Sequence, residues 1–124
     1  MAGARPESAA PTILIGDDDP NIRSVLRRFL EEKGYRVETA DNGQECLDGA
    51  ERFAPHLILL DIDMPVMNGL EALQRIRQIK NPPAVMMITG NEDATTARSC
   101  MELGACDYIV KPEFVKSFET VSQS

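Results

Sequence analysis

The chain has 124 residues, of which 43% are hydrophobic and 27% charged, and its formal net charge is −7. This length suits one domain with one core, and the composition is that of an ordinary globular protein, which excludes disorder throughout. The negative charge argues against direct binding to nucleic acid or to an anionic membrane, and no apolar run approaches the roughly 20 residues that span a bilayer. Because the first eleven residues lack the apolar centre of a signal peptide, we expect a cytoplasmic protein.

The domain is expected to open with a strand and a helix. Residues 1–11 are Ala, Pro, Ser and charged residues without an apolar period, which predicts a disordered tail before a folded domain at 12–124. Residues 12–16 form a nearly continuous apolar run, as in a strand covered on both faces. Asp19 and Pro20 are typical of an N-cap and a first helical position, and an apolar stripe then continues to a Lys-Gly pair.

The alternation of short apolar strands and helices continues to the end of the chain. Further strands are expected at 35–40, 56–61, 84–89 and 105–110. Helices are expected after Asn42-Gly43 with Cys46, Leu47, Ala50 and Phe53 inward, after Gly69 with Leu70, Leu73, Ile76 and Ile79 inward, from about 92 to 103, and around Phe114, Phe118 and Val121. Five such units predict a parallel sheet between helices, with 56–61 in its centre and 35–40 near an edge.

The cysteines and the one histidine do not indicate a metal or nucleophile site. Cys46, Cys100 and Cys106 lack metal-ligand spacing, so we interpret them as small buried hydrophobic residues. His56 stands at the start of the strand expected at 56–61 and has no Ser or Cys partner, which argues against a catalytic base.

Polar side chains follow several of the predicted strands. Asp17, Asp18, Asp61, Thr89 and Lys111 all stand at carboxyl ends of strands. In a parallel sheet these ends meet at one edge, outside which ligands bind. We therefore expect the five side chains to converge, whereas Asp19 alone reads as a helix cap.

Three carboxylates in one pocket indicate a cation. Like charges so close would repel, and oxygen ligands without a twelve-residue calcium loop favour Mg²⁺; the alternative is a set of surface acids without a metal. A carboxylate can accept a phosphoryl group and form an acyl phosphate, so Asp61 is the candidate acceptor. Mg²⁺ and Lys111 would then neutralise charge on the transferring group, while Thr89 offers a hydroxyl to it.

These motifs together resemble the receiver domain of two-component response regulators. The resemblance covers about residues 12–121 and is carried by the acidic pair after the first strand, the Leu-Leu-Asp-Ile-Asp-Met-Pro run, Thr89, and Tyr108 ahead of Lys111-Pro112. It implies a flavodoxin-like, doubly wound (βα)5 sandwich whose five-stranded parallel sheet has the order 2-1-3-4-5.

The resemblance also implies a role for each acid. Asp61 matches the phospho-acceptor, Asp18 a direct metal ligand and Asp17 a metal-site acid that acts largely through water, while Asp63 offers its backbone carbonyl to the metal. The phosphoryl group would come from a histidine kinase or a phosphotransfer protein. The chain would be a signalling switch that catalyses only its own phosphorylation and dephosphorylation.

The implied switch consists of Thr89 and Tyr108. The hydroxyl is drawn toward the phosphoryl group and the ring turns inward, which changes the surface formed by the fourth helix, the fifth strand and the last helix. An output domain or target protein would read that surface. The chain is then either a stand-alone receiver or a fragment of a longer regulator.

Three positions depart from the family pattern. Gly16 replaces an apolar residue, His56 stands where Asp is frequent, and Asp63 places an extra carboxylate beside the acceptor. We hypothesise that Asp63 tightens cation binding or alters the lifetime of the acyl phosphate.

Two alternative functions use the same residues. Asp61-Ile-Asp63 after an apolar strand also resembles the nucleophile motif of haloacid-dehalogenase-type phosphatases, which rapid turnover of a phosphomonoester would support. A degenerate receiver that binds partners without phosphorylation would show no response to Mg²⁺ near Asp61.

Overall fold

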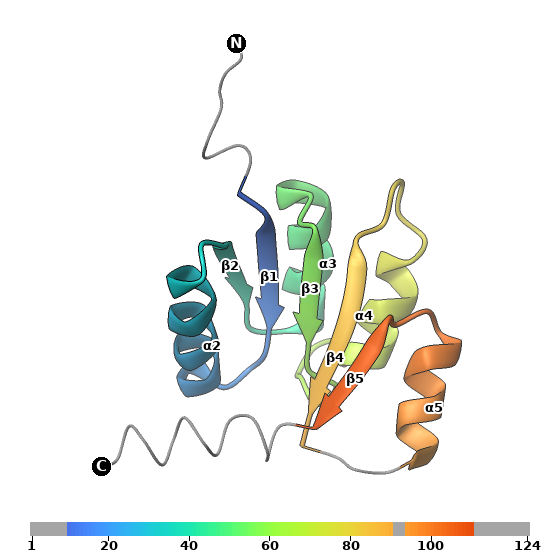
Figure 1. The fold of residues 1–124 in the computed structure, drawn as a ribbon. Coiled ribbons are helices and arrows are strands. Elements are labelled where there is room, and N and C mark those ends of the chain that lie inside the picture. Colours follow the sequence, from blue (N-terminus) through green and yellow to red (C-terminus); the bar gives the residue numbers. More distant parts are fainter. Residues whose placement is uncertain (1–9, 91–93, 111–124) are drawn as a thin grey trace.

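A computed structural model describes residues 10–90 and 94–110 (Figure 1). The elements in chain order are β1 (Thr12–Gly16), α2 (Pro20–Glu32), β2 (Arg36–Ala40), α3 (Gly43–Phe53), β3 (Leu57–Leu60), α4 (Gly69–Ile76), β4 (Ala84–Thr89), α5 (Ala94–Glu102) and β5 (Asp107–Val110). The strands form one sheet in the order β2-β1-β3-β4-β5, and every neighbouring pair is parallel. The predicted fold class and strand order are confirmed, with β3 central and β2 at an edge.

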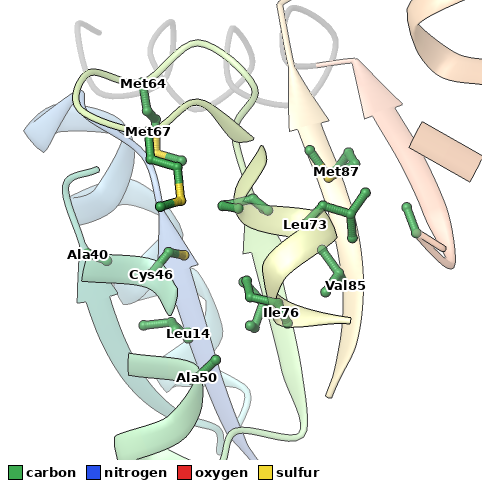
Figure 2. Close-up of a cluster of buried hydrophobic side chains, with 14 of the residues drawn as sticks. Leu14, Ala40, Cys46, Ala50, Met64, Met67, Leu73, Ile76, Val85 and Met87 are labelled. Atoms are coloured by element: carbon green, nitrogen blue, oxygen red, sulfur yellow. The ribbon is translucent and has the colours of Figure 1, made fainter. Parts of the chain in front are cut away.

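The strands alternate their side chains between two apolar clusters, because successive residues of a strand point to opposite faces. In β1, Leu14 packs into the cluster that α3 and α4 cover, whereas Ile13 and Ile15 pack into the cluster that contains Leu26 of α2. Figure 2 shows the larger cluster, in which Leu73 and Ile76 of α4 lie beside Val85 and Met87 of β4. Figure 1 shows the matching layers: α2 lies on one face of the sheet and α3, α4 and α5 on the other.

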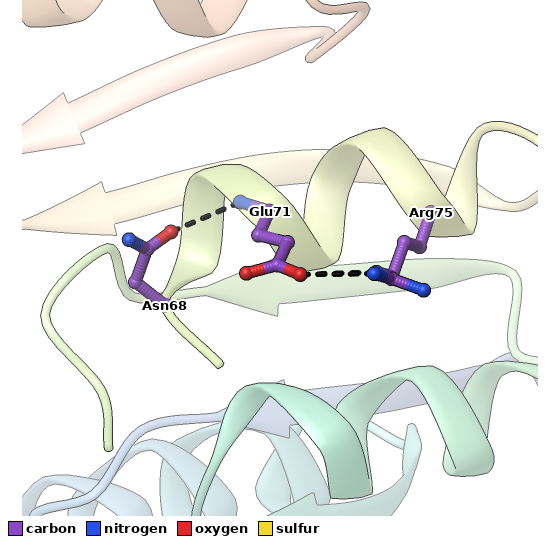
Figure 3. Close-up of polar contacts among 3 residues, drawn as sticks. All are labelled: Asn68, Glu71 and Arg75. Carbon is purple, nitrogen blue, oxygen red and sulfur yellow. Dashed lines mark hydrogen bonds and ion pairs between the residues drawn. The ribbon is translucent and has the colours of Figure 1, made fainter. Parts of the chain in front are cut away.

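Three helices begin with a side chain that caps them at the carboxyl edge of the sheet. Asp19, Asn42 and Asn68 accept backbone N–H bonds from the first turns of α2, α3 and α4. Figure 3 shows the third cap, where Asn68 accepts from Glu71 over 3.0 Å and Glu71 pairs with Arg75 one turn further on. Because each helix starts where a strand has ended, the positive ends of these three helices lie at the same edge.

Two expectations about burial are wrong. Phe53 was expected inward but is 37% exposed, since it ends α3, where its ring lies against the guanidinium of Arg52 instead. Cys46 and Cys100 are buried as predicted, whereas Cys106 is exposed just before β5 begins.

Some predicted segments fall outside the described residues. The predicted tail lies there up to residue 9, although Pro11 already accepts a backbone hydrogen bond from Arg36 over 2.9 Å. The helix expected around Phe114, Phe118 and Val121 also lies outside them. Among the helices that are described, none combines the length and the apolar character that crossing a membrane requires.

Candidate functional site

The three acids at the ends of β1 and β3 come together as expected. Asp17, Asp18 and Asp61 each offer a carboxylate oxygen, and these oxygens lie within 4.8 Å of one another. Asp17 is 2% exposed and Asp61 4%, whereas Asp18 is open to solvent. Two buried acids and one exposed acid thus form a group that a cation can reach from outside.

The backbone of the sheet fixes the two buried acids. The N–H of Asp61 donates to the carbonyl of Gly16 over 2.8 Å, which extends the pairing of β3 with β1 by one residue. On the other side of β1, the N–H of Asp17 donates to Ala40 over 3.1 Å. Because both acids continue hydrogen-bonded strands, their positions follow from the sheet register.

The turn after β1 is held by side chains as well. One carboxylate oxygen of Asp17 accepts the N–H of Asp19 over 2.9 Å, and Nη1 of Arg23 donates to the Asp17 carbonyl over 2.6 Å. Sequence reasoning missed Arg23. The available signal was a cation within the first turn of a helix that starts directly after an acidic pair.

The loop after Asp61 closes back onto this residue. The N–H of Gly69 donates to the carbonyl of Ile62 over 2.8 Å, and a Cβ added at Gly69 would overlap the carbonyl oxygen of Asp61. A Cβ at Gly43 would likewise overlap the carbonyl of Met67, in the same loop. Only glycine lets the starts of α3 and α4 approach this loop so closely.

The Cys46 side chain packs directly against the backbone of Gly16, the residue before the acidic pair. A Cβ built on Gly16 would lie 2.5 Å from the Cys46 sulfur and 3.1 Å from Leu60, so the thiol occupies space that a larger residue at 16 would need. Burial raises the pKa of the Cys46 thiol to about 12. It is therefore a neutral packing group and no nucleophile.

The remaining predicted site residues are placed in part. Thr89 ends β4 and pairs with Val110, the last residue of β5, so its backbone lies at the same edge of the sheet as the acids. Its side chain lies outside the described part, as do Lys111, which follows Val110 directly, and Asn91. Tyr108 is half-buried in β5 and packs against the larger core cluster.

Asp63 and His56 stand apart from the acidic group. The Asp63 side chain is exposed and does not belong to the group of three acids, while its N–H donates to Asp61 over a long 3.4 Å. His56 lies at the amino end of β3, where its Nδ1 accepts the N–H of Thr12 over 3.1 Å. His56 thus lies at the opposite edge of the sheet, where it joins the start of β3 to the start of β1.

The donor set fits a hard divalent cation. All three ligand groups are carboxylates, which suit Mg²⁺ or Ca²⁺ better than a metal that prefers nitrogen or sulfur. An ion bound by two buried acids and one exposed acid would offset their mutual repulsion while keeping coordination positions open to solvent. The three carboxylates are therefore a donor set that a hard divalent cation can occupy.

Comparison with known proteins identifies the family. The family model described as response regulator receiver domain matches residues 13–121. The chain belongs to this family. Receiver domains are the phosphorylation-activated switches of two-component signal transduction, and members bind Mg²⁺ at an acidic pocket of the kind formed here.

Relatives and solved structures agree with this assignment. The transcriptional regulatory protein PhoP of Bacillus subtilis is 39% identical over 100 residues, which cover 81% of this chain and 42% of that protein. A protein-glutamate methylesterase/protein-glutamine glutaminase of the same organism is 41% identical, with 81% and 29% covered. The chain thus spans less than half of these relatives, and the match covers only a minor part of the enzyme.

The fold similarity extends over nearly the whole chain. The chemotaxis protein CheY4 of Vibrio cholerae has a TM-score of 0.78 at 30% identity, with 93% of this receiver and 98% of that chain covered. The response regulator domain of Thermotoga maritima CheB has a TM-score of 0.77 at 33% identity, with 83% and 79% covered. Both comparisons support the same five-stranded architecture.

Proposed function

We propose that Asp61 is the residue of this receiver that accepts the phosphoryl group, from the phosphohistidine of a histidine kinase or a phosphotransfer protein in the cytoplasm. The supporting observation is that its buried carboxylate lies within 4.8 Å of those of Asp17 and Asp18 at the carboxyl edge of the sheet. A phosphoryl acceptor that bears a negative charge needs such a cation site beside it, because the incoming group is negative too.

The reaction is an in-line transfer. A carboxylate oxygen of Asp61 attacks phosphorus and forms the acyl phosphate, while the phosphorus–nitrogen bond breaks and its electron pair stays on the donor imidazole. Water later attacks the same phosphorus, which releases inorganic phosphate and restores the carboxylate. The chain would catalyse these two steps on itself and no other reaction.

Mg²⁺ would be held by the carboxylates of Asp18 and Asp61 and by the Asp63 carbonyl, while Asp17 would act largely through water. When bound, the ion supplies positive charge that offsets the charge of the transferring group. Asp61 and Asp17 are fixed by strand hydrogen bonds, so they would keep their positions during the transfer. On the basis of the sequence pattern, we assign Lys111 and the Thr89 hydroxyl to contacts with the remaining phosphoryl oxygens.

Mass spectrometry tests the proposal directly. Incubated with acetyl phosphate and Mg²⁺, the protein should gain one phosphoryl group, and EDTA should prevent the gain. Asp61→Asn should show none, because an amide cannot form the acyl phosphate. Asp48→Asn, which changes an exposed acid on α3, is the matched control and should react as the wild type does. No gain in the wild type, or an undiminished gain in Asp61→Asn, would refute the proposal.

We further propose that Asp63 influences the lifetime of the acyl phosphate more than cation binding. Its carboxylate is exposed and stands outside the group of three acids, yet its backbone contacts Asp61. It therefore borders the route of an attacking water without being a metal ligand through its side chain. Dephosphorylation half-lives of wild type and Asp63→Asn would decide this, and equal half-lives would end the hypothesis.

The output is proposed to pass through Thr89 and Tyr108 to the surface that includes α5 and β5. Tyr108 is half-buried and packs against the larger core cluster, so a change in the position of its ring would alter how β5 packs on that cluster. Met101 of α5 is 47% exposed, which suits a surface that contacts an output domain or a target protein. Amide shifts after acetyl phosphate addition should then include residues of α5 and β5. Shifts confined to the ends of β1 and β3 would contradict this route.

A further inference from the structure

Arg23 makes two hydrogen bonds to the turn that carries the acidic pair, one through its side chain and one through its backbone. Its Nη1 donates to the carbonyl oxygen of Asp17 over 2.6 Å. Its backbone N–H, in the first turn of α2, donates to the carbonyl of Asp19 over 3.0 Å. These two carbonyls belong to the residues on either side of Asp18, so one residue holds the main chain both before and after this acid.

Asp18 depends on such support more than the other two acids do. The ladders of β1 end at Gly16, and the N–H of Asp17 adds one more strand bond, so Asp18 lies beyond the sheet. Its side chain is exposed. The direction of its carboxylate is consequently set by the turn, and not by burial or by the sheet.

We propose that Arg23 is a positioning residue for Asp18 and through it for the Mg²⁺ site. The inference depends on the metal binding proposed above. Groups that orient metal ligands without touching the metal typically change metal affinity by about 10- to 100-fold when they are removed. We expect a loss at the lower end of this range, because the bond between Asp19 and the Asp17 carboxylate still supports the turn.

Charge alone gives the opposite expectation. A guanidinium near three carboxylates competes with an incoming cation, so its removal should tighten Mg²⁺ binding if electrostatics dominated. The half-buried guanidinium is instead tied to the main chain by its 2.6 Å hydrogen bond, so its removal also frees the turn that carries Asp18. The two explanations therefore predict opposite signs for the same substitution.

Magnesium titrations followed by the backbone amide signals of Gly16, Asp18 and Ile62 distinguish them. Arg23→Met should raise the Kd for Mg²⁺ about tenfold. Arg27→Met removes an exposed cation one turn further along α2, where it pairs with Glu31, and should change the Kd less than twofold. Arg23→Lys keeps the charge and one donor, so it should recover part of the affinity.

A variant that is destabilised at another position tests whether a loss of stability alone weakens Mg²⁺ binding. Val25→Ala truncates a half-buried side chain on the same helix without touching the turn, and should leave the Kd of the folded protein unchanged. An unchanged or tighter Kd in Arg23→Met, or an equal loss in Val25→Ala, would overturn the inference. If the wild type itself shows no shifts with Mg²⁺, the proposed function fails, which is a separate outcome.

Discussion

The two edges of the sheet are built from the same backbone bonds but carry opposite kinds of side chain. At the amino edge His56 closes the start of β1, since its Nδ1 accepts from Thr12 and its N–H donates to the Thr12 carbonyl over 2.9 Å. At the carboxyl edge, bonds of the same kind fix Asp17 and Asp61, two acids that the fold buries close together. The amino edge therefore stabilises the domain, while the carboxyl edge keeps three carboxylates close together, whose mutual repulsion a bound cation would offset.

This difference follows from the direction of the chain. Each described strand delivers its last residue, and each described helix its positive end, to the carboxyl edge. The caps Asp19, Asn42 and Asn68 lie there, and so do the glycines that bring α3 and α4 close to the acceptor loop, which is the loop at 62–68 after the proposed acceptor. Changes at this edge should affect chemistry and stability together, whereas changes at the amino edge should affect stability alone.

The largest effect is expected at Gly69. Gly69→Ala places a methyl group on the carbonyl of Asp61, so α4 or the acceptor loop must move, and overpacking of this kind costs about 3 kcal/mol. Urea unfolding should show this loss together with slower phosphorylation by acetyl phosphate. Gly90→Ala is the control at the same edge, because an added Cβ there meets no atom within 4 Å in the part of the chain that the structure describes. Equal stability of the two variants would contradict the close packing.

The second effect is stabilisation by the cation itself. A ligand present at 100 times its Kd stabilises the native state by about 2.7 kcal/mol when it does not bind the unfolded chain. Asp18→Asn removes one of the three acids; with a Kd raised about tenfold, the same Mg²⁺ concentration should stabilise it by only about 1.4 kcal/mol. Thermal unfolding with and without Mg²⁺ measures both values. Equal stabilisation of the two proteins would show that the ion binds elsewhere.

Much of this site could be predicted because it depends on periodicity. Short apolar runs, which alternate with helical stripes along the chain, placed Asp17 and Asp61 at the ends of predicted strands. In a parallel sheet these ends lie at the same edge. The bounds of β1 and β4 agree with the sequence pattern to the residue. Local rules sufficed here because each acid directly continues a strand.

The rest depends on side-chain contacts that apolar periodicity does not encode. The bond from Arg23 to Asp17 joins residues six positions apart, and its one local signal is the cation in the first turn of α2; the contact of Cys46 with Gly16 joins two separate elements, α3 and β1. Phe53 has helical spacing for burial, yet it ends α3 and remains partly exposed. Periodicity assigns a residue to a face of its helix, but it does not show how far the neighbouring layer extends.

A smaller effect is expected at the amino edge. His56→Ala removes the acceptor of the Thr12 N–H, and because this site is exposed, water can replace it, so the loss should be about 1 kcal/mol. The rate of phosphorylation by acetyl phosphate should stay unchanged, since His56 lies at the other end of β3. His56→Asn offers a carbonyl oxygen in place of Nδ1 and should recover most of the stability. Slower phosphorylation in either variant would contradict the expectation that changes at the amino edge affect stability alone.

The smallest effect, and one of opposite sign, is expected at Val66. This residue lies in the acceptor loop with φ at 69°, and its neighbours close a tight turn in which the Met67 N–H donates to the Pro65 carbonyl over 2.7 Å. A β-branched residue is strained at a positive φ. The Val66 side chain is 82% exposed, so packing gives little stabilisation to offset this strain. Val66→Asn should therefore stabilise the domain by about 0.5 to 1 kcal/mol, because Asn tolerates positive φ. Urea unfolding measures the gain, with Val66→Ile as the control that keeps the strain. A loss of stability in Val66→Asn would mean that the valine side chain supports the loop in spite of its exposure.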